Sequence, residues 1–219
     1  MAESGDRNVT AHETIDERLL NRVIFFTDAV FAIVLTLLVL DLRPPAAGRS
    51  LGSPGVAQEL WNHFFALAMS FVVIGIFWVA HLATTRRLHR FDWPSVVANL
   101  AFLFPVCLLP FATAWWGSAI NSPLAWSVYG VVMTVTSLGN VALVLVSTRG
   151  GGRLMLGGVT GRERAYRAAR AASPGIAFSL GVAMTAAGYL QLSQFCWVLI
   201  PILLLICGLV LKPRPAARA

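Results

Sequence analysis

The chain has 219 residues, of which 57% are hydrophobic and only 12% are charged. Soluble domains carry about 25% charged residues, so this composition excludes an ordinary soluble protein and predicts an all-α protein that crosses a membrane several times. The net charge of +7 could indicate nucleic-acid binding. However, the basic residues lie between the apolar segments, where they indicate topology and contact with anionic lipids and no nucleic-acid partner.

Six segments are long and apolar enough to cross a bilayer, which takes about 20 residues. The uncharged tract 93–148 is long enough for two helices, and its GSAINSP sequence at 117–123 is the expected turn. A second uncharged tract, 171–211, breaks near GYLQLS at 188–193. The predicted spans in chain order are 20–42, 60–83, 94–116, 124–146, 171–188 and 192–211.

The distribution of lysine and arginine predicts the orientation of these spans. Fifteen of the basic residues fall in the N-terminal segment, the second and fourth loops and the C-terminal tail, against only Arg43 and Arg49 on the other side. The positive-inside rule then places both termini in the cytoplasm of a multi-pass plasma-membrane protein. We expect a cytoplasmic segment at 1–18, a six-helix membrane domain at 19–211 and a basic tail at 212–219.

Two segments resemble motifs of other protein classes. PPAAG after the first span could be a signal-peptide cleavage site, but the long acidic leader and the charges of Asp41 and Arg43 favour an uncleaved helix. RGGGRLMLGGVTG at 149–161 is glycine-rich but lacks the Gly-Lys-Ser/Thr ending of a phosphate-binding loop. We expect neither an enzyme nor a metal site or cofactor, and we expect small buried side chains at the three cysteines: Cys107, Cys196 and Cys207.

The first span, RVIFFTDAVFAIVLTLLVLDL at 22–42, carries charge inside its first two turns. At about 100° of rotation per residue, Ile33, Leu37 and Leu40 share one narrow apolar face. Asp28 points to nearly the opposite side, so it does not share the environment of that face. The apolar face continues toward the cytoplasm through two residues and has a hydroxyl at its edge: Phe26, Val30 and Thr36.

A carboxylate inside a membrane span needs a polar partner, because an unpaired charge there is costly. Trp78 and His81, at the cytoplasmic end of the second span, could both donate to Asp28, and Asn99 in the third span is another donor. Arg22 lies on a different face of the first helix. A structural polar clamp is the favoured interpretation, and a proton relay or gate is the alternative.

These residues carry a resemblance to a known family. Arg22-x-x-x-Phe26-Thr27-Asp28 resembles the Arg-x-x-x-Phe-Ser-Asp signature of the lysosomal potassium channel family (transmembrane protein 175) and its bacterial relatives. The FW-x-x-H sequence that ends at His81 resembles the second-helix pattern of that family. Thr27 replaces the serine and keeps its hydroxyl, whereas Leu82 stands where relatives often carry a second histidine.

The resemblance implies a homotetramer of six-helix chains in which the first helix lines a central pore. Ile33 would form the narrowest ring, Leu37 and Leu40 would form further rings, and Thr36 would tune ion preference. The resemblance also implies that a structural clamp holds the cytoplasmic end of the helix: Arg22, Phe26, Thr27, Asp28, Trp78 and His81.

The predicted function is therefore a potassium-preferring cation channel that conducts passively through an apolar constriction. Its partners would be its own copies, membrane lipids and permeant monovalent cations, K+ foremost. One alternative is a proton-coupled secondary transporter that titrates Asp28 and His81. A third hypothesis is a non-conducting membrane scaffold.

Overall fold

The computed structural model describes residues 3–45 and 51–212, with side chains from Arg18 onward. Most of the described residues lie in helices, and none lies in a strand, which confirms the all-α class. All of the expected tail at 212–219 except Lys212 lies outside the described residues, as do the side chains of the expected N-terminal segment before Arg18. The division into segments at 1–18, 19–211 and 212–219 therefore stays a prediction.

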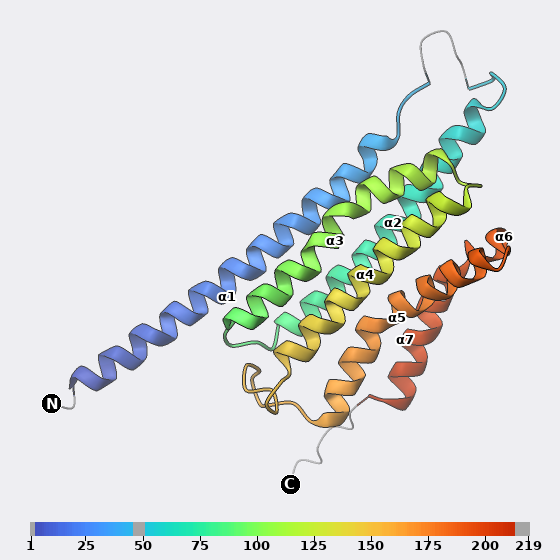
Figure 1. Cartoon of the computed structure of the whole chain (residues 1–219). Coiled ribbons are helices and arrows are strands. Elements are labelled where there is room, and N and C mark those ends of the chain that lie inside the picture. Colours follow the sequence, from blue (N-terminus) through green and yellow to red (C-terminus); the bar gives the residue numbers. More distant parts are fainter. Residues whose placement is uncertain (1–2, 46–50, 213–219) are drawn as a thin grey trace.

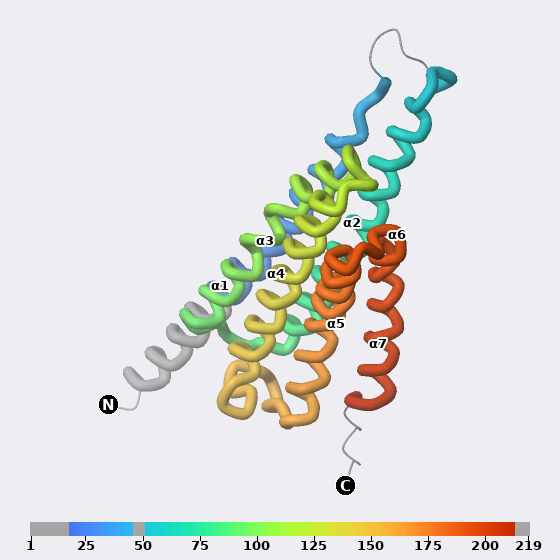
Figure 2. Tube along the Cα trace, turned by 45° about the vertical axis from the view of Figure 1, so that its right-hand side comes forward, coloured from blue at the N-terminus to red at the C-terminus, as the bar shows by residue number. Residues whose placement is uncertain are grey.

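The helices follow one another as an up-and-down bundle, with α1 along one side and α7 on another (Figures 1 and 2). Short helical pieces extend α1 and precede α7. The elements in chain order are α1 (Glu3–Leu37), η1 (Leu38–Asp41), α2 (Val56–Thr85), α3 (Trp93–Ser118), α4 (Pro123–Ser147), α5 (Gly161–Ala186), α6 (Leu190–Ser193), η2 (Cys196–Val198) and α7 (Leu199–Val210).

Five of the six predicted spans coincide, to within a few residues, with helical segments long and apolar enough to cross a membrane. These segments are Arg18–Asp41, Val56–Thr85, Trp93–Ser118, Pro123–Ser147 and Leu190–Val210. The sixth prediction, 171–188, corresponds to the apolar second half of α5. This helix already begins at Gly161 within the basic segment, because the Thr160 hydroxyl accepts a hydrogen bond from the Glu163 N–H at 3.2 Å and caps it.

Large buried side chains from α3, α4 and α5 fill the centre of the bundle. Trp116, Trp126 and Tyr129 are fully buried, and their ring centroids lie 4.9 to 5.6 Å apart. Phe178 of α5 closes the cluster against Tyr129 at 5.6 Å. Because this centre is packed solid with aromatic rings, it leaves no aqueous path through the described part of one chain along this axis.

The loops at the basic end of the bundle pack on each other. The loop after α2 pairs with the loop after α4 through Leu88 and Met155. Asp92 caps α3 by accepting hydrogen bonds from the Ser95 N–H at 3.1 Å and hydroxyl at 2.7 Å, and it forms an ion pair with Arg149. Burial acts to raise the pKa of Asp92, but these hydrogen bonds and the Arg149 charge outweigh it and hold the pKa below its ordinary value.

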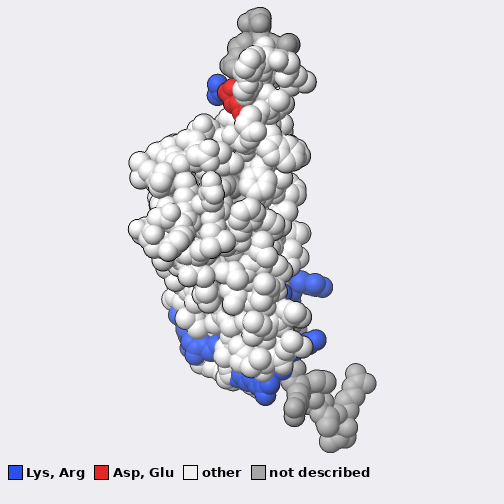
Figure 3. All heavy atoms as spheres, turned by 90° about the vertical axis from the view of Figure 1, so that its right-hand side faces the viewer, with Lys and Arg blue, Asp and Glu red and all other residues white. Residues whose placement is uncertain are grey.

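Charge is divided between the two ends of the molecule. Lysine and arginine gather at the lower end, whereas acidic side chains lie near the upper end beside a small basic patch (Figure 3). The first helix begins and the last helix ends at the basic end (Figure 1). This distribution is the one that the loop charges predict for a protein with a single orientation in the membrane.

Candidate functional site: the first helix and its polar contacts

The apolar ridge, which we define as Ile33, Leu37 and Leu40, lies on the outside of the described chain. Its side chains are 57%, 41% and 68% exposed. The interleaved Val34 and Leu38 are only 3% and 2% exposed, because they pack into the core against α2 and α3. The first helix therefore has one face committed to its own subunit and another left for lipid or for further copies of the chain.

The ridge stays aligned although the helix changes its winding. The α-helix ends at Leu37 and continues as a 3-10 turn over Leu38–Asp41. Side chains three residues apart eclipse each other in a 3-10 helix, so Leu40 remains in line with Leu37. Beside the ridge, the exposed Thr36 hydroxyl donates to the Ile33 carbonyl at 2.8 Å.

Asp28 contacts one of the polar partners that the sequence suggested for it, Trp78. The indole N–H of Trp78 donates to its carboxylate at 2.9 Å, which joins α1 to α2. Both side chains are partly exposed, so the pair lies at the edge of the helix contact and not in the core. A charge-assisted hydrogen bond across two helices fixes their rotation and depth relative to each other.

His81 belongs to a second, fully buried chain of hydrogen bonds. Its Nε2 lies 3.0 Å from the Asn99 amide oxygen, and the Asn99 amide N–H donates to the Thr27 hydroxyl at 2.9 Å. Thr27 in turn donates to the Val23 carbonyl at 2.9 Å. Because the amide oxygen can only accept, Nε2 carries the proton. The chain therefore joins α2, α3 and α1 with each polar group in a defined role.

Aromatic rings hold the imidazole of this chain in place. His81 stacks on Phe102 with ring centroids 5.8 Å apart and planes 12° from parallel, and Phe31 lies 6.4 Å away. The side chains of His81, Asn99 and Thr27 are at most 1% exposed. The arrangement is that of a packed structural junction.

Arg22 and Phe26 lie at the edge of this junction that faces the start of α1. Both are exposed, and they line a pocket of about 500 Å³ between α1 and α3 together with Asn99. In the described part of the chain, Arg22 forms no hydrogen bond or ion pair. The predicted clamp residues therefore form two separate hydrogen-bonded groups. Asp28 pairs with Trp78, and Thr27 is connected to His81 through Asn99. Arg22 and Phe26 belong to neither group.

Asn99 has other partners than the one that the sequence suggested for it. The sequence offered it as a donor to Asp28, whereas in the structure it bridges His81 and Thr27. A buried asparagine in an apolar span signals an interhelical hydrogen bond. The signal does not name its partner, because the other two residues lie 18 and 72 positions away.

The opposite end of the ridge also carries charged groups. Asp41 lies 3.2 Å from His63 Nδ1 of α2, in a pocket of about 410 Å³ that Arg43 and Glu59 also line. Among the described residues no group of three His, Cys, Asp or Glu side chains could hold a metal ion. The polar side chains at the two ends of this helix therefore act through hydrogen bonds and ion pairs and not, among the described residues, as a metal site.

Comparison with known proteins shows which family the first half of this chain is similar to. The model of the family described as "Endosomal/lysosomal potassium channel TMEM175" matches residues 22–110. A protein of Streptomyces collinus named as a potassium channel is 36% identical over 134 residues, which cover 59% of this chain and 65% of that protein. One of a Chryseobacterium species, also named as a potassium channel, is 27% identical over 80% of this chain and 90% of its own length.

Solved structures resemble this chain over most of its length. A homolog of the lysosomal potassium-selective channel TMEM175, from Chamaesiphon minutus, matches with a TM-score of 0.72 over 86% of this chain and 98% of that one, at 23% identity. A variant of the potassium channel MtTMEM175 matches with a TM-score of 0.61 at 17% identity, over 86% of this chain and 92% of that one. At these identities the likeness establishes the fold. The resemblance seen in the sequence is confirmed, and the family is one of ion channels and not of enzymes.

Proposed function

We propose that the chain forms a potassium-preferring cation channel, because its residues 22–110, which carry most of the first three membrane helices, match the TMEM175 family. Four copies would surround a central pore lined by α1, with Ile33 as the narrowest ring and Leu37 and Leu40 as further rings. The assembly would sit in the plasma membrane with both termini in the cytoplasm.

The observation that carries this proposal is the exposed apolar ridge beside a tightly packed inner face. Ile33 is 57% exposed, while Val34, the next residue, is 3% exposed. A pore inside one chain would need polar lining, and the core of the described residues is filled with aromatic and aliphatic side chains. A pore formed between the α1 helices of several chains would be lined by their exposed faces, so no single chain would need a polar channel of its own.

An apolar ring can control ions without binding them. Water leaves a narrow apolar constriction, so ions cross only when it widens enough to stay wet. Potassium sheds its hydration more readily than sodium, so a ring of Ile33 side chains favours potassium modestly. Thr36 supports this ring, because its hydroxyl holds the Ile33 carbonyl at 2.8 Å beside the ridge.

The clamp residues Asp28, Thr27, Trp78 and His81 would hold the cytoplasmic end of the pore helix. Asp28 and His81 sit in different hydrogen-bond sets, with Trp78 and Asn99 respectively. A proton-coupled transporter would need these two groups on one path, so no contact of the described residues favours that alternative. Arg22 and Phe26 would line the cytoplasmic entrance.

The test is ion flux through purified protein in liposomes and single-channel recording in planar bilayers. We expect passive potassium current with unit conductance far above any carrier rate. Ile33→Asn should wet the constriction and reduce discrimination between potassium and sodium. Val39→Asn is the matched control, since Val39 is 55% exposed but lies off the ridge. Unchanged ion preference in Ile33→Asn, or flux strictly coupled to protons, would refute the proposal.

A further inference from the structure

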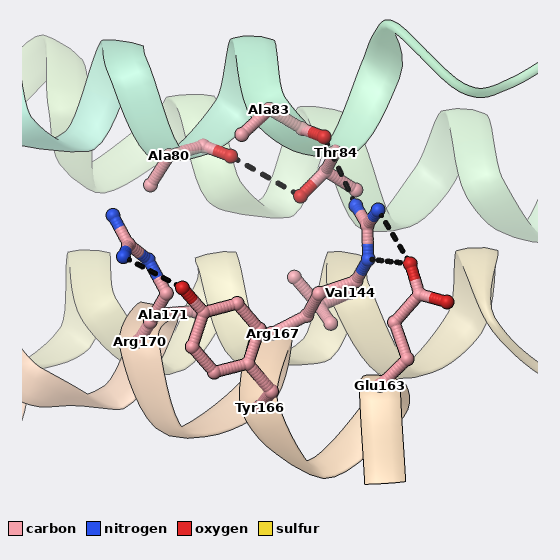
Figure 4. A pocket seen from close by; sticks show the side chains of 9 residues that line it. All are labelled: Ala80, Ala83, Thr84, Val144, Glu163, Tyr166, Arg167, Arg170 and Ala171. Carbon is pink, nitrogen blue, oxygen red and sulfur yellow. Dashed lines mark hydrogen bonds and ion pairs between the residues drawn. The ribbon is translucent and has the colours of Figure 1, made fainter. Parts of the chain in front are cut away.

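Two adjoining pockets open between α2, α4, α5 and α7, away from the ridge. The first, of about 350 Å³, lies at the basic end of the bundle and is lined by Thr84, Tyr166 and Arg170 among others (Figure 4). The second, of about 480 Å³, continues from it along α2 toward the middle of the bundle. The two share Ala80, Arg170 and Ala171, so they form one continuous groove.

The second pocket has the walls of a site for a hydrocarbon chain. Its lining is almost entirely apolar, from Phe71, Val72 and Ile76 of α2 to Leu204 of α7. Gly75 leaves open space along this pocket, since a Cβ added there would meet no atom within 4 Å. A groove of this length, open at the side of a membrane helix, accommodates an extended acyl chain.

Arg170 stands where the two pockets meet and has no acidic partner among the described residues. Its guanidinium donates to the Tyr166 hydroxyl at 3.0 Å and lies 5.5 Å from the ring centroid. Glu163, the carboxylate that also lines the first pocket, instead pairs with Arg87 and Arg167. Figure 4 shows the Arg170 guanidinium on the far side of Tyr166 from Glu163.

The position of Arg170 favours an anionic partner. It is the last basic residue before the uncharged tract 171–211, and it borders the apolar pocket. A guanidinium at this boundary, with no acidic partner among the described residues, attracts an anionic group from the membrane. Phosphate fits best, because its oxygens accept the parallel N–H groups of arginine.

A second polar side chain in the groove also lacks a partner. Asn140 of α4 is fully buried and lines the apolar pocket together with Arg170. Neither its amide nitrogen nor its amide oxygen has a hydrogen-bond partner among the described residues. An unpaired buried amide calls for a polar group from outside the chain. The ester oxygens of a glycerolipid, which lie between the phosphate and the acyl chains, would accept from its N–H group.

We propose that this groove binds one anionic phospholipid from the membrane leaflet at the basic end of the bundle. The phosphate contacts Arg170, the ester region reaches Asn140, and one acyl chain lies along α2 over Gly75. This site is separate from the apolar ridge and does not depend on whether the protein conducts ions.

Native mass spectrometry of the delipidated full chain in detergent tests this site. The probes are phosphatidylglycerol and phosphatidylcholine with identical acyl chains. We expect phosphatidylglycerol to bind better, and Arg170→Gln to weaken it about fivefold, the contribution of one arginine to binding an anionic lipid. Arg86→Gln is the control, because Arg86 is exposed at the end of α2 and lines neither pocket. Equal losses in both variants would show diffuse surface attraction and overturn the site.

A second variant separates a lipid from a soluble anion. Gly75→Leu fills open space and leaves Arg170 intact, so it should reduce the binding of both lipids while the protein remains folded. Inorganic phosphate is the third probe, and it should not compete at the concentrations where the lipid binds. Lipid binding unaffected by Gly75→Leu, or full competition by inorganic phosphate, would assign the Arg170 pocket to a soluble anion and refute the proposal. Arg170→Lys, which keeps the charge, should retain part of the preference and serves if Arg170→Gln fails to fold.

Discussion

At the scale of single residues, the buried polar chain through Thr27, Asn99 and His81 shows how a membrane protein selects one packing of its helices. Asn99 bonds to both His81 and Thr27, the Thr27 hydroxyl also donates to the Val23 carbonyl, and all three side chains are at most 1% exposed. An apolar interface alone would tolerate rotation or sliding of α1 against α2 and α3. The hydrogen bonds do not, because a shift by one residue would leave buried groups unpaired.

Thr27 offers a direct test of this chain. Thr27→Val keeps the shape but leaves the Asn99 amide N–H without its acceptor at 2.9 Å. We expect a loss of about 1 kcal/mol in the free energy of unfolding, typical of a buried hydrogen bond between membrane helices. Thr27→Ser keeps the hydroxyl and should stay within about 0.5 kcal/mol of the wild type. Unfolding in mixed micelles measures both variants, and equal stability of the two would contradict the role of the hydroxyl.

The sequence could identify the residues of the candidate site but not their connections. The period of Ile33, Leu37 and Leu40 places them on one face, and the structure leaves them all exposed. The pairing of Asp28 with Trp78 and not with His81 depends on helix rotation, which local pattern does not encode. Whether the ridge lines a pore depends on copies of the chain, so that interpretation stays a prediction.

At the scale of elements, α5 and α7 show which boundaries a sequence can give. The T-G-R-E sequence at 160–163 is a capping-box pattern, and a search for it would have started α5 at Gly161. Pro201 likewise lies in the first turn of α7, where its missing N–H costs little. Hydropathy alone placed the start of this helix at 171 and not at Gly161. Arginines lower the hydropathy of the segment before 171, but they do not end a helix.

Close approach of α3 and α4 depends on a glycine, which a pair of variants can test. A Cβ at Gly139 would lie 2.9 Å from the Phe102 Cα, so Gly139→Ala must push the two helices apart. We expect a loss of about 1–3 kcal/mol, the usual cost of overpacking. Gly75→Ala should instead be neutral or stabilise by up to about 1 kcal/mol, since it enters open space and favours the helix. Thermal unfolding of the Gly139→Ala and Gly75→Ala variants measures the difference. Similar unfolding midpoints for the two variants would contradict the close packing of α3 against α4.

The contact between the loops at the basic end of the bundle should depend on pH through Asp92. Its folded pKa lies below the ordinary value, so the stabilisation is complete above the unfolded pKa of about 3.9 and is lost as the pH falls through the folded value. We expect the stability difference between wild type and Asp92→Asn to be constant near neutral pH and to shrink below about pH 4. Denaturant unfolding at several pH values measures this difference, and a difference that grows in acid would contradict the ion pair with Arg149.

At the scale of the whole molecule, the faces of the chain divide into two kinds. The aromatic centre and the polar junction hold the subunit together, whereas the ridge on α1 and the groove beside Arg170 lie on its outside. The two outer features lie on different sides of the bundle, one along α1 and the other between α2, α5 and α7. One chain can therefore meet its own copies on one side and a lipid on another.

Cysteine crosslinking distinguishes a ridge at a shared axis from a ridge that faces lipid. If four α1 helices meet at Ile33, cysteines there approach the Cα separation of about 4.4–6.8 Å that a disulfide needs. In a background with Cys107→Ser and Cys207→Ser, Ile33→Cys should form covalent dimers under mild oxidation, visible on denaturing gels. Val39→Cys, equally outside the packed core, should not. Crosslinks at Val39 without crosslinks at Ile33 would place the ridge against lipid, and since the constriction is built only from that ridge, the proposed pore would then have no lining.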